Sequence, residues 1–298
     1  MKALVTGIAG FTGHYLAEAL ARRAISVVGL AQSASLVKCV DRIHAVDITD
    51  FDALERVVVA EKPDLVAHLA AISHVAHENI EEMYRTNLIG TRNLLEALTS
   101  LETPPRSVLL ASSSNVYGNR NEGMMSENMA PDPVNDYSVS KVAAEMVAGL
   151  YQSRLPICVV RPFNYTGVGQ AHSFLLPKIV EHVRRGAHTI ELGNLDVARD
   201  FSDVRTVTQA YIRLLSSRAA IGRTLNVCSG RAHTVQEVLA LVKEVSGCSL
   251  DVRVNPSLIR HNDVKILLGS RARLDECIGP IHNIELRDTL AWMLGASQ

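Results

Sequence analysis

The first 162 residues alternate short apolar runs with longer amphipathic segments, and this alternation constrains the fold more than any other feature. The short runs are rich in β-branched residues and leucine and predict strands, whereas the longer segments repeat their apolar residues at helical spacing. The expected strands are 2–6, 26–30, 43–46, 64–69, 106–112 and 157–161, and the expected helices lie near 11–23, 51–61, 79–99 and 137–152. Repeated strand–helix units predict an α/β protein with a doubly wound parallel sheet, the Rossmann architecture.

Beyond residue 163 the pattern loosens into loops that contain glycine and asparagine. Helices are expected near 172–186, 205–217, 234–246 and 284–294, and short strands near 188–192 and 224–228. We therefore expect a Rossmann domain over residues 1–163 and a smaller C-terminal α/β substrate-binding lobe over residues 164–298, with some exchange of strands and helices between them.

Composition argues against several classes of partner. The 298-residue chain has a formal net charge of −1 and 47% hydrophobic residues, so it lacks the basic excess that nucleic acid or an anionic membrane favours. No apolar run approaches membrane-spanning length, and we expect a cytoplasmic protein. The five cysteines are scattered and lack CxxC spacing, which argues against disulfides or a metal site and predicts five packing residues.

A glycine-rich turn, Gly7-Ile-Ala-Gly10-Phe11-Thr12-Gly13, follows the first expected strand and precedes the first expected helix. Glycines at this spacing allow a tight turn and close approach of the backbone to a ligand. The amides at the helix N-terminus face outward, where the pyrophosphate of a dinucleotide can bind. The predicted cofactor contacts are this turn and the residues after the fourth strand: Gly7, Gly10, Phe11, Thr12, Gly13, Leu69, Ala70 and Ala71.

Two further turns bear on the dinucleotide. Gln32 follows the second strand, at the position where an acidic residue would bind the ribose 2′-hydroxyl of NAD, and no carboxylate is there to repel a 2′-phosphate. This favours NADP(H) and leaves NAD(H) open, because the nearest basic residues, Lys38 and Arg42, lie several positions further on. Asp47 and Ile48 follow the third strand and are expected to cover the adenine, with capping of the next helix by Asp47 as the alternative.

Tyr137 and Lys141 lie four positions apart at the start of a predicted helix, so their side chains share one face. A nearby ammonium favours the phenolate, and the sequence therefore predicts a lowered pKa for Tyr137 and proton exchange with a substrate oxygen. Both residues are also expected to border the cofactor. Ser113, at the polar end of the 106–112 strand, is predicted to give the reacting oxygen a second hydrogen bond. Asn87 is predicted to hold a water that relays protons to Lys141, or else to be a polar residue on a helix face.

Three later stretches carry a family resemblance: Arg161-Pro-Phe-Asn164-Tyr-Thr-Gly-Val-Gly-Gln170, residues 192–204 and residues 260–270. With the motifs above, the chain resembles the extended short-chain dehydrogenase/reductase superfamily, which acts on nucleotide sugars, and within it the GDP-4-keto-6-deoxy-D-mannose reductases. The resemblance implies a GDP-sugar site in which Asn164 meets the diphosphate, Arg199 and Arg260 clamp it, Asp263 binds the ribose or a neighbouring group, and Lys178 lines the guanine pocket. The chain departs from the pattern at His261, where the family has Pro, and at Thr206, where it usually has Asp.

The resemblance also bears on the reaction. The related 4,6-dehydratases use an acidic residue or its partner beside the catalytic hydroxyl, where this chain has Ser114 and Asn115, which are expected to contact the substrate. Neither side chain is a carboxylate base, so dehydration is disfavoured. The implied reaction is reduction of the C4 keto group of GDP-4-keto-6-deoxy-D-mannose to GDP-D-rhamnose, with hydride from NAD(P)H and a proton from Tyr137. The alternatives are a nucleotide-sugar C4 epimerase, a GDP-mannose 4,6-dehydratase-like enzyme and a non-catalytic dinucleotide sensor.

The resemblance further implies a homodimer, in which the 79–99 and 137–152 helices pair across a two-fold axis as a four-helix bundle. Both helices carry apolar residues beyond those that one core needs: Ile80, Met83, Leu94, Leu98, Val142, Met146 and Leu150. The alternative is that these residues pack inside the monomer.

Overall fold

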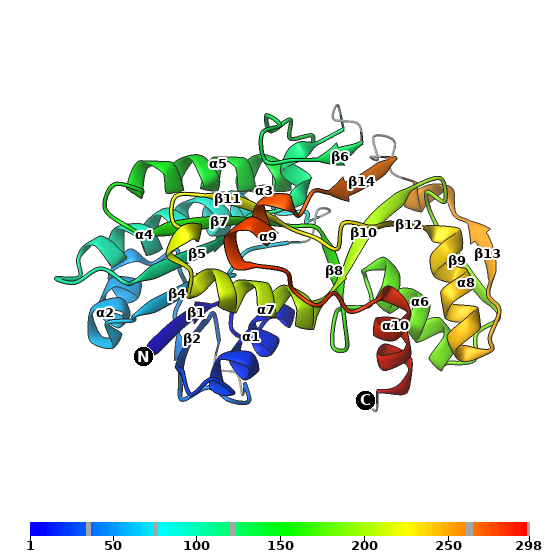
Figure 1. Cartoon of the computed structure of the whole chain (residues 1–298), viewed down its shortest axis with the longest axis horizontal. Coiled ribbons are helices and arrows are strands. Elements are labelled where there is room, and N and C mark those ends of the chain that lie inside the picture. The colour runs from blue at the N-terminus through cyan, green and yellow to red at the C-terminus, as the bar shows by residue number, and fades with distance from the viewer. Residues whose placement is uncertain (34–36, 74–76, 120–122, 260–264, 297–298) are drawn as a thin grey trace.

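The computed structural model describes residues 1–33, 37–73, 77–119, 123–259 and 265–296. Its larger part is a seven-stranded parallel sheet with the order β11-β7-β5-β4-β1-β2-β3 (Figure 1). From β1 the chain moves outward to β3 and then returns to β4 on the other side of β1, which is the reversal of a doubly wound fold. The expected strands are confirmed with small shifts: β1 (Lys2–Thr6), β2 (Ser26–Ala31), β3 (Arg42–Ala45), β4 (Leu65–His68), β5 (Ser107–Ala111), β7 (Ile157–Pro162) and β11 (Thr224–Val227).

Helices cover both faces of this sheet. On one face lie α1 (Phe11–Ala21), α7 (Val204–Leu215) and α9 (Ala272–Ile278), and on the other lie α2 (Phe51–Glu61), α4 (Thr91–Thr99) and α5 (Asp136–Tyr151). Because side chains alternate along a strand, neighbouring residues enter different cores. Ala3 and Val5 pack with α1 and α7, whereas Leu4 packs with α2 and α4.

The helix expected over 79–99 is divided into segments. It comprises α3 (Ile80–Tyr84), a π-helical segment (Arg85–Gly90) and α4. Gly90, at the end of the π segment, fits closely against Ile48, since a Cβ at Gly90 would lie 2.5 Å from the Ile48 Cδ1. A single π turn inside a helix re-aims the side chains it carries and is frequent at functional sites.

A smaller lobe lies at one end of the large sheet (Figure 1). It contains a sheet with the order β12-β10-β14-β6, in which β8 also pairs with β10, and a two-stranded sheet of β9 and β13. The short strands are β6 (Met124–Met125), β8 (Asn164–Thr166), β9 (Thr189–Leu192), β10 (Ala198–Asp203), β12 (Ala232–Thr234), β13 (Asp251–Val254) and β14 (Ile266–Gly269). The helices α6 (Leu175–Arg184), α8 (Val235–Ser246) and α10 (Leu286–Gly295) close a separate apolar core.

The two parts exchange elements in both directions. The strand near 224–228 is β11, which pairs with β7 at the edge of the large sheet, and α7 packs on α1. In the opposite direction β6, from the first half of the chain, pairs with β14 in the lobe. The lobe is therefore tied to the large sheet by several crossings of the chain, and the boundary at 163/164 stays a prediction.

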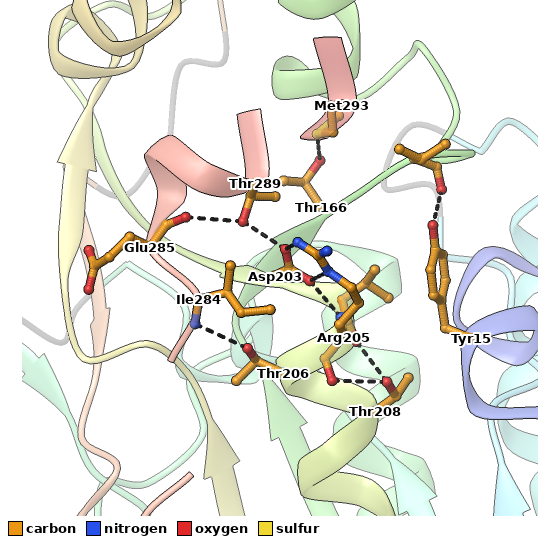
Figure 2. A network of polar contacts seen from close by, with 12 residues as sticks. Tyr15, Thr166, Asp203, Arg205, Thr206, Thr208, Ile284, Glu285, Thr289 and Met293 are labelled. Atoms are coloured by element: carbon orange, nitrogen blue, oxygen red, sulfur yellow. Dashed lines mark hydrogen bonds and ion pairs between the residues drawn. The ribbon is translucent and has the colours of Figure 1, made fainter. Parts of the chain in front are cut away.

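A polar network anchors the C-terminal helix to the junction between the two parts (Figure 2). Asp203 caps α7 and holds the Arg205 guanidinium in a bidentate pair, with Nε–Oδ1 at 2.9 Å and Nη2–Oδ2 at 2.6 Å. Thr289 of α10 donates to the same carboxylate at 2.8 Å, and the guanidinium stacks 3.8 Å from the ring centre of Trp292. Tyr15 of α1 completes the junction by donating to the Val168 carbonyl at 2.6 Å.

The cysteine prediction is only partly right. Cys158 and Cys228 are buried and Cys277 is half-buried, but Cys39 and Cys248 are exposed, because both lie in loops outside the apolar cores. Among the described residues, no helix combines the length and the apolarity needed to cross a membrane.

Candidate active site

The glycine-rich turn joins β1 to α1 at the carboxyl edge of the sheet, as predicted. Gly7 has φ +68°, and a Cβ there would lie 2.8 Å from the backbone nitrogen of Ala70. A Cβ at Gly13 would lie 2.5 Å from the carbonyl oxygens of Gly7 and Ile8. Gly10 is the N-cap of α1 and contributes no side-chain cap, so the first helical amides point toward the edge where an anion can bind. Gly7 and Gly13 therefore each have a steric reason to be there.

Phe11 and Thr12 attach this turn to β8. The Phe11 ring stacks on Tyr165 with centroids 6.1 Å apart, and Thr12 Oγ1 hydrogen-bonds the Tyr165 hydroxyl at 2.7 Å. Tyr165 follows Asn164, so the turn expected to bind the cofactor contacts the strand expected to bind the sugar nucleotide. Sequence reasoning missed Tyr165, because its role depends on a contact across 153 positions of the chain.

The turns after β2 and β3 agree less well with expectation. Gln32 is exposed directly after β2, whereas Arg42, one of the two nearby bases, is paired with Glu61 at 2.7 Å. Asp47 does not cap α2: its carboxylate accepts from the Thr49 amide, and the cap is Asp50. Ile48 is buried in the core beneath α4. Contact of Asp47 and Ile48 with an adenine stays a prediction.

Helix α5, which carries the expected catalytic residues Tyr137 and Lys141, begins next to the end of β5. An Asn135–Ser138 capping box fixes its first turn and thereby places Tyr137 at the sheet edge. Ser113, Tyr137 and Lys141 are only 7%, 7% and 5% exposed, and Ser113 hydrogen-bonds the Tyr137 phenol. The structure thus brings the three predicted catalytic residues to one place.

The predicted lowering of the Tyr137 pKa is wrong in this structure. Burial raises the pKa of Tyr137 to about 12, and the hydrogen bond with Ser113 only opposes that rise. The expected ammonium effect is absent because Lys141 Nζ donates to the carbonyl oxygen of Ala111 at 2.7 Å. Tyr137 is therefore a neutral phenol at ordinary pH, which is the protonation state a proton donor requires.

Lys141 has an unusual charge environment. Burial lowers its pKa to about 8, and the Glu145 carboxylate one turn further along α5 works against that lowering. Glu145 itself is held by Arg161 of β7, with Nε–Oε1 at 2.9 Å and Nη2–Oε2 at 2.7 Å, and by the Ser112 hydroxyl. Glu145, one half of this pair, therefore opposes the effect of burial on Lys141, and the pair was not foreseen from the sequence.

The polar residues after β5 separate into distinct roles. Ser113 caps the 3₁₀ turn Ser114–Tyr117 by accepting from the Asn115 amide at 3.1 Å, and Ser114 is buried. Tyr117 is fully buried and donates to Asn226 at 2.7 Å. Of this stretch, Ser113 alone has a hydrogen bond to the Tyr137 phenol.

Asn87 lies in the π-helical segment and its side chain is bonded on several sides. Its Oδ1 accepts from the Ile72 amide at 2.8 Å, and its Nδ2 donates to the Ile72 carbonyl at 3.1 Å and to Ser140 Oγ at 3.0 Å. Asn87 thus links the turn after β4 with the catalytic helix. The water relay to Lys141 stays a prediction, and it would use the second lone pair of Oδ1.

The residues expected to bind the nucleotide sugar lie in the lobe. Asn164 is exposed at the start of β8 and is in register with Phe201 of β10, the strand that carries Arg199. Arg199 donates to the Ala198 carbonyl at 2.9 Å, and Lys178 of α6 donates to the Glu191 carbonyl at 2.6 Å. The neighbouring β8 and β10 thus carry two of these residues. Arg260 and Asp263 lie outside the described residues.

Comparison with known protein families matches residues 4–293 to the family described as GDP-mannose 4,6 dehydratase. The chain belongs to this family. Membership confirms the superfamily expected from the motifs. The matched residues include both the large sheet and the smaller lobe.

Two relatives are similar over nearly their full lengths. The GDP-6-deoxy-D-talose 4-dehydrogenase of Aggregatibacter actinomycetemcomitans is 35% identical over 94% of this chain and 92% of its own. The GDP-6-deoxy-D-mannose reductase of Pseudomonas aeruginosa is 33% identical over 98% of this chain and 96% of its own.

Solved structures confirm the fold. A protein of Burkholderia cenocepacia J2315 is 46% identical and superposes with a TM-score of 0.92, covering 98% of this chain and 96% of its own. RMD of Pseudomonas aeruginosa, solved with NADPH, is 32% identical with a TM-score of 0.84 over 98% of this chain and 96% of its own.

Proposed function

We propose that this protein reduces the C4 keto group of GDP-4-keto-6-deoxy-D-mannose with NADPH and produces GDP-D-rhamnose. The buried Ser113–Tyr137–Lys141 set, in which Tyr137 is a neutral phenol, carries the proposal. The reductase of Pseudomonas aeruginosa supports it, because 6-deoxy-D-mannose, which its name specifies, is D-rhamnose.

The residues around the glycine turn fit a nicotinamide dinucleotide. The turn from Gly7 to Gly13 would hold the pyrophosphate, since a side chain at Gly7 or Gly13 would collide with backbone. Gln32 leaves the 2′ position without a carboxylate, which supports NADP(H), with NAD(H) as the alternative. The bound dinucleotide would supply the hydride for the C4 carbon.

The chain's own side chains would handle the proton. The C4 oxygen needs a proton as the carbon accepts hydride, and the Tyr137 phenol would donate it while Ser113 hydrogen-bonds the same oxygen. The Lys141 ammonium shares a face of α5 with Tyr137 and, on exchanging its bond to the Ala111 carbonyl, would stabilise the negative charge left on Tyr137 while it stays protonated. Asn164 and Arg199 would hold the diphosphate of the substrate from β8 and β10.

Dehydration fits the site less well, although the family is described by that activity. A dehydratase base would stand near Ser114 and Asn115, neither of which is a carboxylate. The nearby carboxylate of Glu145 is bound by Arg161 and Ser112 and so is a poor base.

The stereochemistry at C4 has a second candidate. The Aggregatibacter relative acts at C4 of GDP-6-deoxy-D-talose, and 6-deoxytalose differs from rhamnose only in its C4 configuration. The same Ser113–Tyr137–Lys141 set would serve either product, because the face presented by the bound sugar decides which alcohol forms.

The purified protein should oxidise NADPH when supplied with GDP-4-keto-6-deoxy-D-mannose, and chromatography should identify GDP-D-rhamnose. If the product is GDP-6-deoxy-D-talose, the second candidate is supported instead. If the protein oxidised neither NADPH nor NADH in the presence of this ketosugar, both candidate reductions would be disproved. Conversion of GDP-D-mannose with NADP⁺ would indicate a dehydratase, and NAD that stays bound through purification, with interconversion of C4 epimers, would indicate an epimerase.

We also propose a homodimer through α3 and α5. Met83, Leu94 and Leu98 are buried in the monomer, so the expectation that they are spare is wrong, but Met146 and Leu150 are 70% and 74% exposed. Val139 lies on the same side of α5, seven positions before Met146, and the neighbouring Ile80 and Ile89 are also exposed. Light scattering should show a dimer that Met146→Lys with Leu150→Lys separates, whereas Val59→Lys on α2 should not. A monomeric wild-type protein would contradict this.

A further inference from the structure

His68, at the end of β4, lies in a buried chain of four hydrogen bonds that joins the central strands to the π-helical segment. The Ala70 amide donates to Thr6 Oγ1 at 3.1 Å, and Thr6 Oγ1 is 2.7 Å from His68 Nδ1. On the other side, His68 Nε2 is 2.9 Å from Thr91 Oγ1, which donates to the Asn87 carbonyl at 2.6 Å. The imidazole of His68 hydrogen-bonds Thr6 and Thr91 and none of the expected catalytic side chains, Ser113, Tyr137 and Lys141.

The Asn87 end of the chain fixes the proton between Thr91 and His68. An amide nitrogen can only donate and a carbonyl can only accept, so Thr91 gives its single proton to Asn87 and must accept from His68 Nε2. Thr6 accepts from Ala70 and gives its own proton to His68 Nδ1. The neutral histidine protonated on Nε2 makes all four bonds and also gives the Thr6 hydroxyl proton an acceptor, whereas an imidazolium would make the four bonds and leave that proton without a partner in the chain.

The surroundings support this neutral form. His68 is 3% exposed, and burial, aided by the positive charge of Lys141, lowers its pKa to about 3. A proton on Nδ1 would leave the Thr6 hydroxyl proton without its acceptor in a buried place, which is costly. The direction of the chain is therefore the same throughout the pH range in which an enzyme works.

The Thr91 end of the chain leads to the catalytic helix. A threonine hydroxyl bonded to the carbonyl four residues earlier alters the local helix geometry, and here that carbonyl belongs to the π-helical segment. The Asn87 side chain then donates to Ser140 Oγ, and Ser140 Oγ donates to the Tyr137 carbonyl at 2.7 Å. His68 thus connects through Thr91, Asn87 and Ser140 to the backbone of Tyr137.

We propose that His68 is a positioning residue for the catalytic helix, and that its Nε2 proton holds, through Thr91, the π turn from which Asn87 fixes the start of α5. The part concerning turnover rests on the proposed reductase function. The Thr6 end of the same chain reaches the turn at Ala70, which faces the expected cofactor site. The two sides of the imidazole therefore have separate effects, which a merely structural histidine would not show.

Two substitutions separate these sides. In His68→Gln the amide nitrogen can occupy the place of Nε2 and still donate to Thr91, whereas in His68→Asn the amide oxygen can occupy the place of Nδ1 and still accept from Thr6. His68→Asn should lower kcat by about tenfold to a hundredfold with little change in the KM for NADPH. His68→Gln should retain most of the wild-type kcat. Equal losses in the two variants, or a greater loss in His68→Gln, would overturn the proposal.

Thr91 provides a second test if a His68 variant does not fold. Thr91→Val removes the hydroxyl with little change of shape and should reproduce the loss in kcat, while Thr91→Ser should restore it. Thr289→Val, which breaks a buried hydroxyl bond in the Asp203 network, is the matched control and should leave kcat unchanged. Full activity in a folded Thr91→Val protein would overturn the proposal.

Two readouts do not depend on the substrate. Nitrogen-15 NMR of the wild-type protein should show His68 neutral with its proton on Nε2, and a proton on Nδ1 or a cationic ring would overturn the proposal. Hydrogen exchange should be faster at the start of α5, residues 137–145, in Thr91→Val than in Thr91→Ser, and equal exchange would contradict it. If the wild-type protein reduces no ketosugar, the proposed function fails while these two measurements still decide the role of His68.

Discussion

The large sheet and the smaller lobe hold their polar site residues in different ways. At the sheet edge, Tyr137 and Lys141 are almost inaccessible and are bonded to groups of neighbouring strands and helices. In the lobe, Asn164 is exposed, and Lys178 and Arg199 donate to main-chain carbonyls at its surface. The sheet therefore has its expected chemical groups in place before a substrate arrives, whereas Lys178 and Arg199 would have to exchange their present partners for a ligand.

This difference assigns separate tasks to the two regions. Buried groups with shifted pKa values can perform proton transfer, because their protonation states are set by the fold. Half-buried bases such as Lys178 and Arg199 can recognise charged groups but contribute mainly to binding. Substitutions at the sheet edge should thus change kcat, and substitutions in the lobe should change KM for the nucleotide sugar.

The strongest test of this separation is Tyr137→Phe. Loss of the proton donor should lower kcat by about a hundredfold to ten-thousandfold, because a phenylalanine ring has no proton to give to the C4 oxygen. Cofactor affinity, measured by titrating NADPH fluorescence, should change little. Normal turnover in this variant would show that another group donates the proton. It would then contradict the assignment of proton transfer to the edge of the large sheet.

The pH dependence of kcat provides the next test. Lys141 carries its charge below its pKa of about 8, so kcat should fall as the pH rises through that value. Because the Glu145 carboxylate raises the pKa of Lys141, Glu145→Gln should move the fall to lower pH. Glu244→Gln, which also breaks a Glu–Arg pair but on α8, should leave the profile unchanged. An unshifted profile in a folded Glu145→Gln protein would contradict the field described for Lys141.

Arg199→Ala tests the lobe. Loss of a charge-assisted contact with the diphosphate should raise the KM for the GDP-sugar by about tenfold to a hundredfold, with kcat largely retained. Arg199→Lys should fall between the wild-type and alanine proteins, because it keeps the charge and loses the planar fork. Initial-rate kinetics would measure both. A loss mainly in kcat would mean that the lobe takes part in the chemistry, and it would contradict the separation of proton transfer at the sheet edge from binding in the lobe.

The smallest effect is expected at the junction between the regions. Thr289→Val removes a buried hydrogen bond to Asp203 and should lower the free energy of unfolding by about 1 kcal/mol. Thermal unfolding would show the change as a lower Tm, while kcat at moderate temperature should stay the same. A loss of turnover in the folded variant would mean that the junction also sets the geometry of the active site.

The large sheet could be predicted closely, because its signals are local. The first strand and the second helix occupy the predicted residues, Lys2–Thr6 and Phe51–Glu61. The strands β6, β8, β10, β12, β13 and β14 were missed. All but β10 are segments of two to four residues, which form strands only when distant partners supply the hydrogen bonds.

The candidate site shows the same limit. Spacing placed Tyr137 and Lys141 on one helix face, but it could not show that Lys141 turns to Ala111 or that burial dominates the pKa of Tyr137. The contacts of His68, Tyr165 and Glu145 were also missed, because each depends on residues brought together only by the fold.

Trp292 is the only tryptophan in the chain. It lies on α10 against the Arg205 guanidinium and 6.0 Å from the ring of Tyr15 on α1, where the lobe meets the large sheet. All tryptophan fluorescence of the protein therefore arises at this junction. The wild-type chain carries a built-in optical probe there, so any movement of the lobe relative to α1 can be followed without an attached dye.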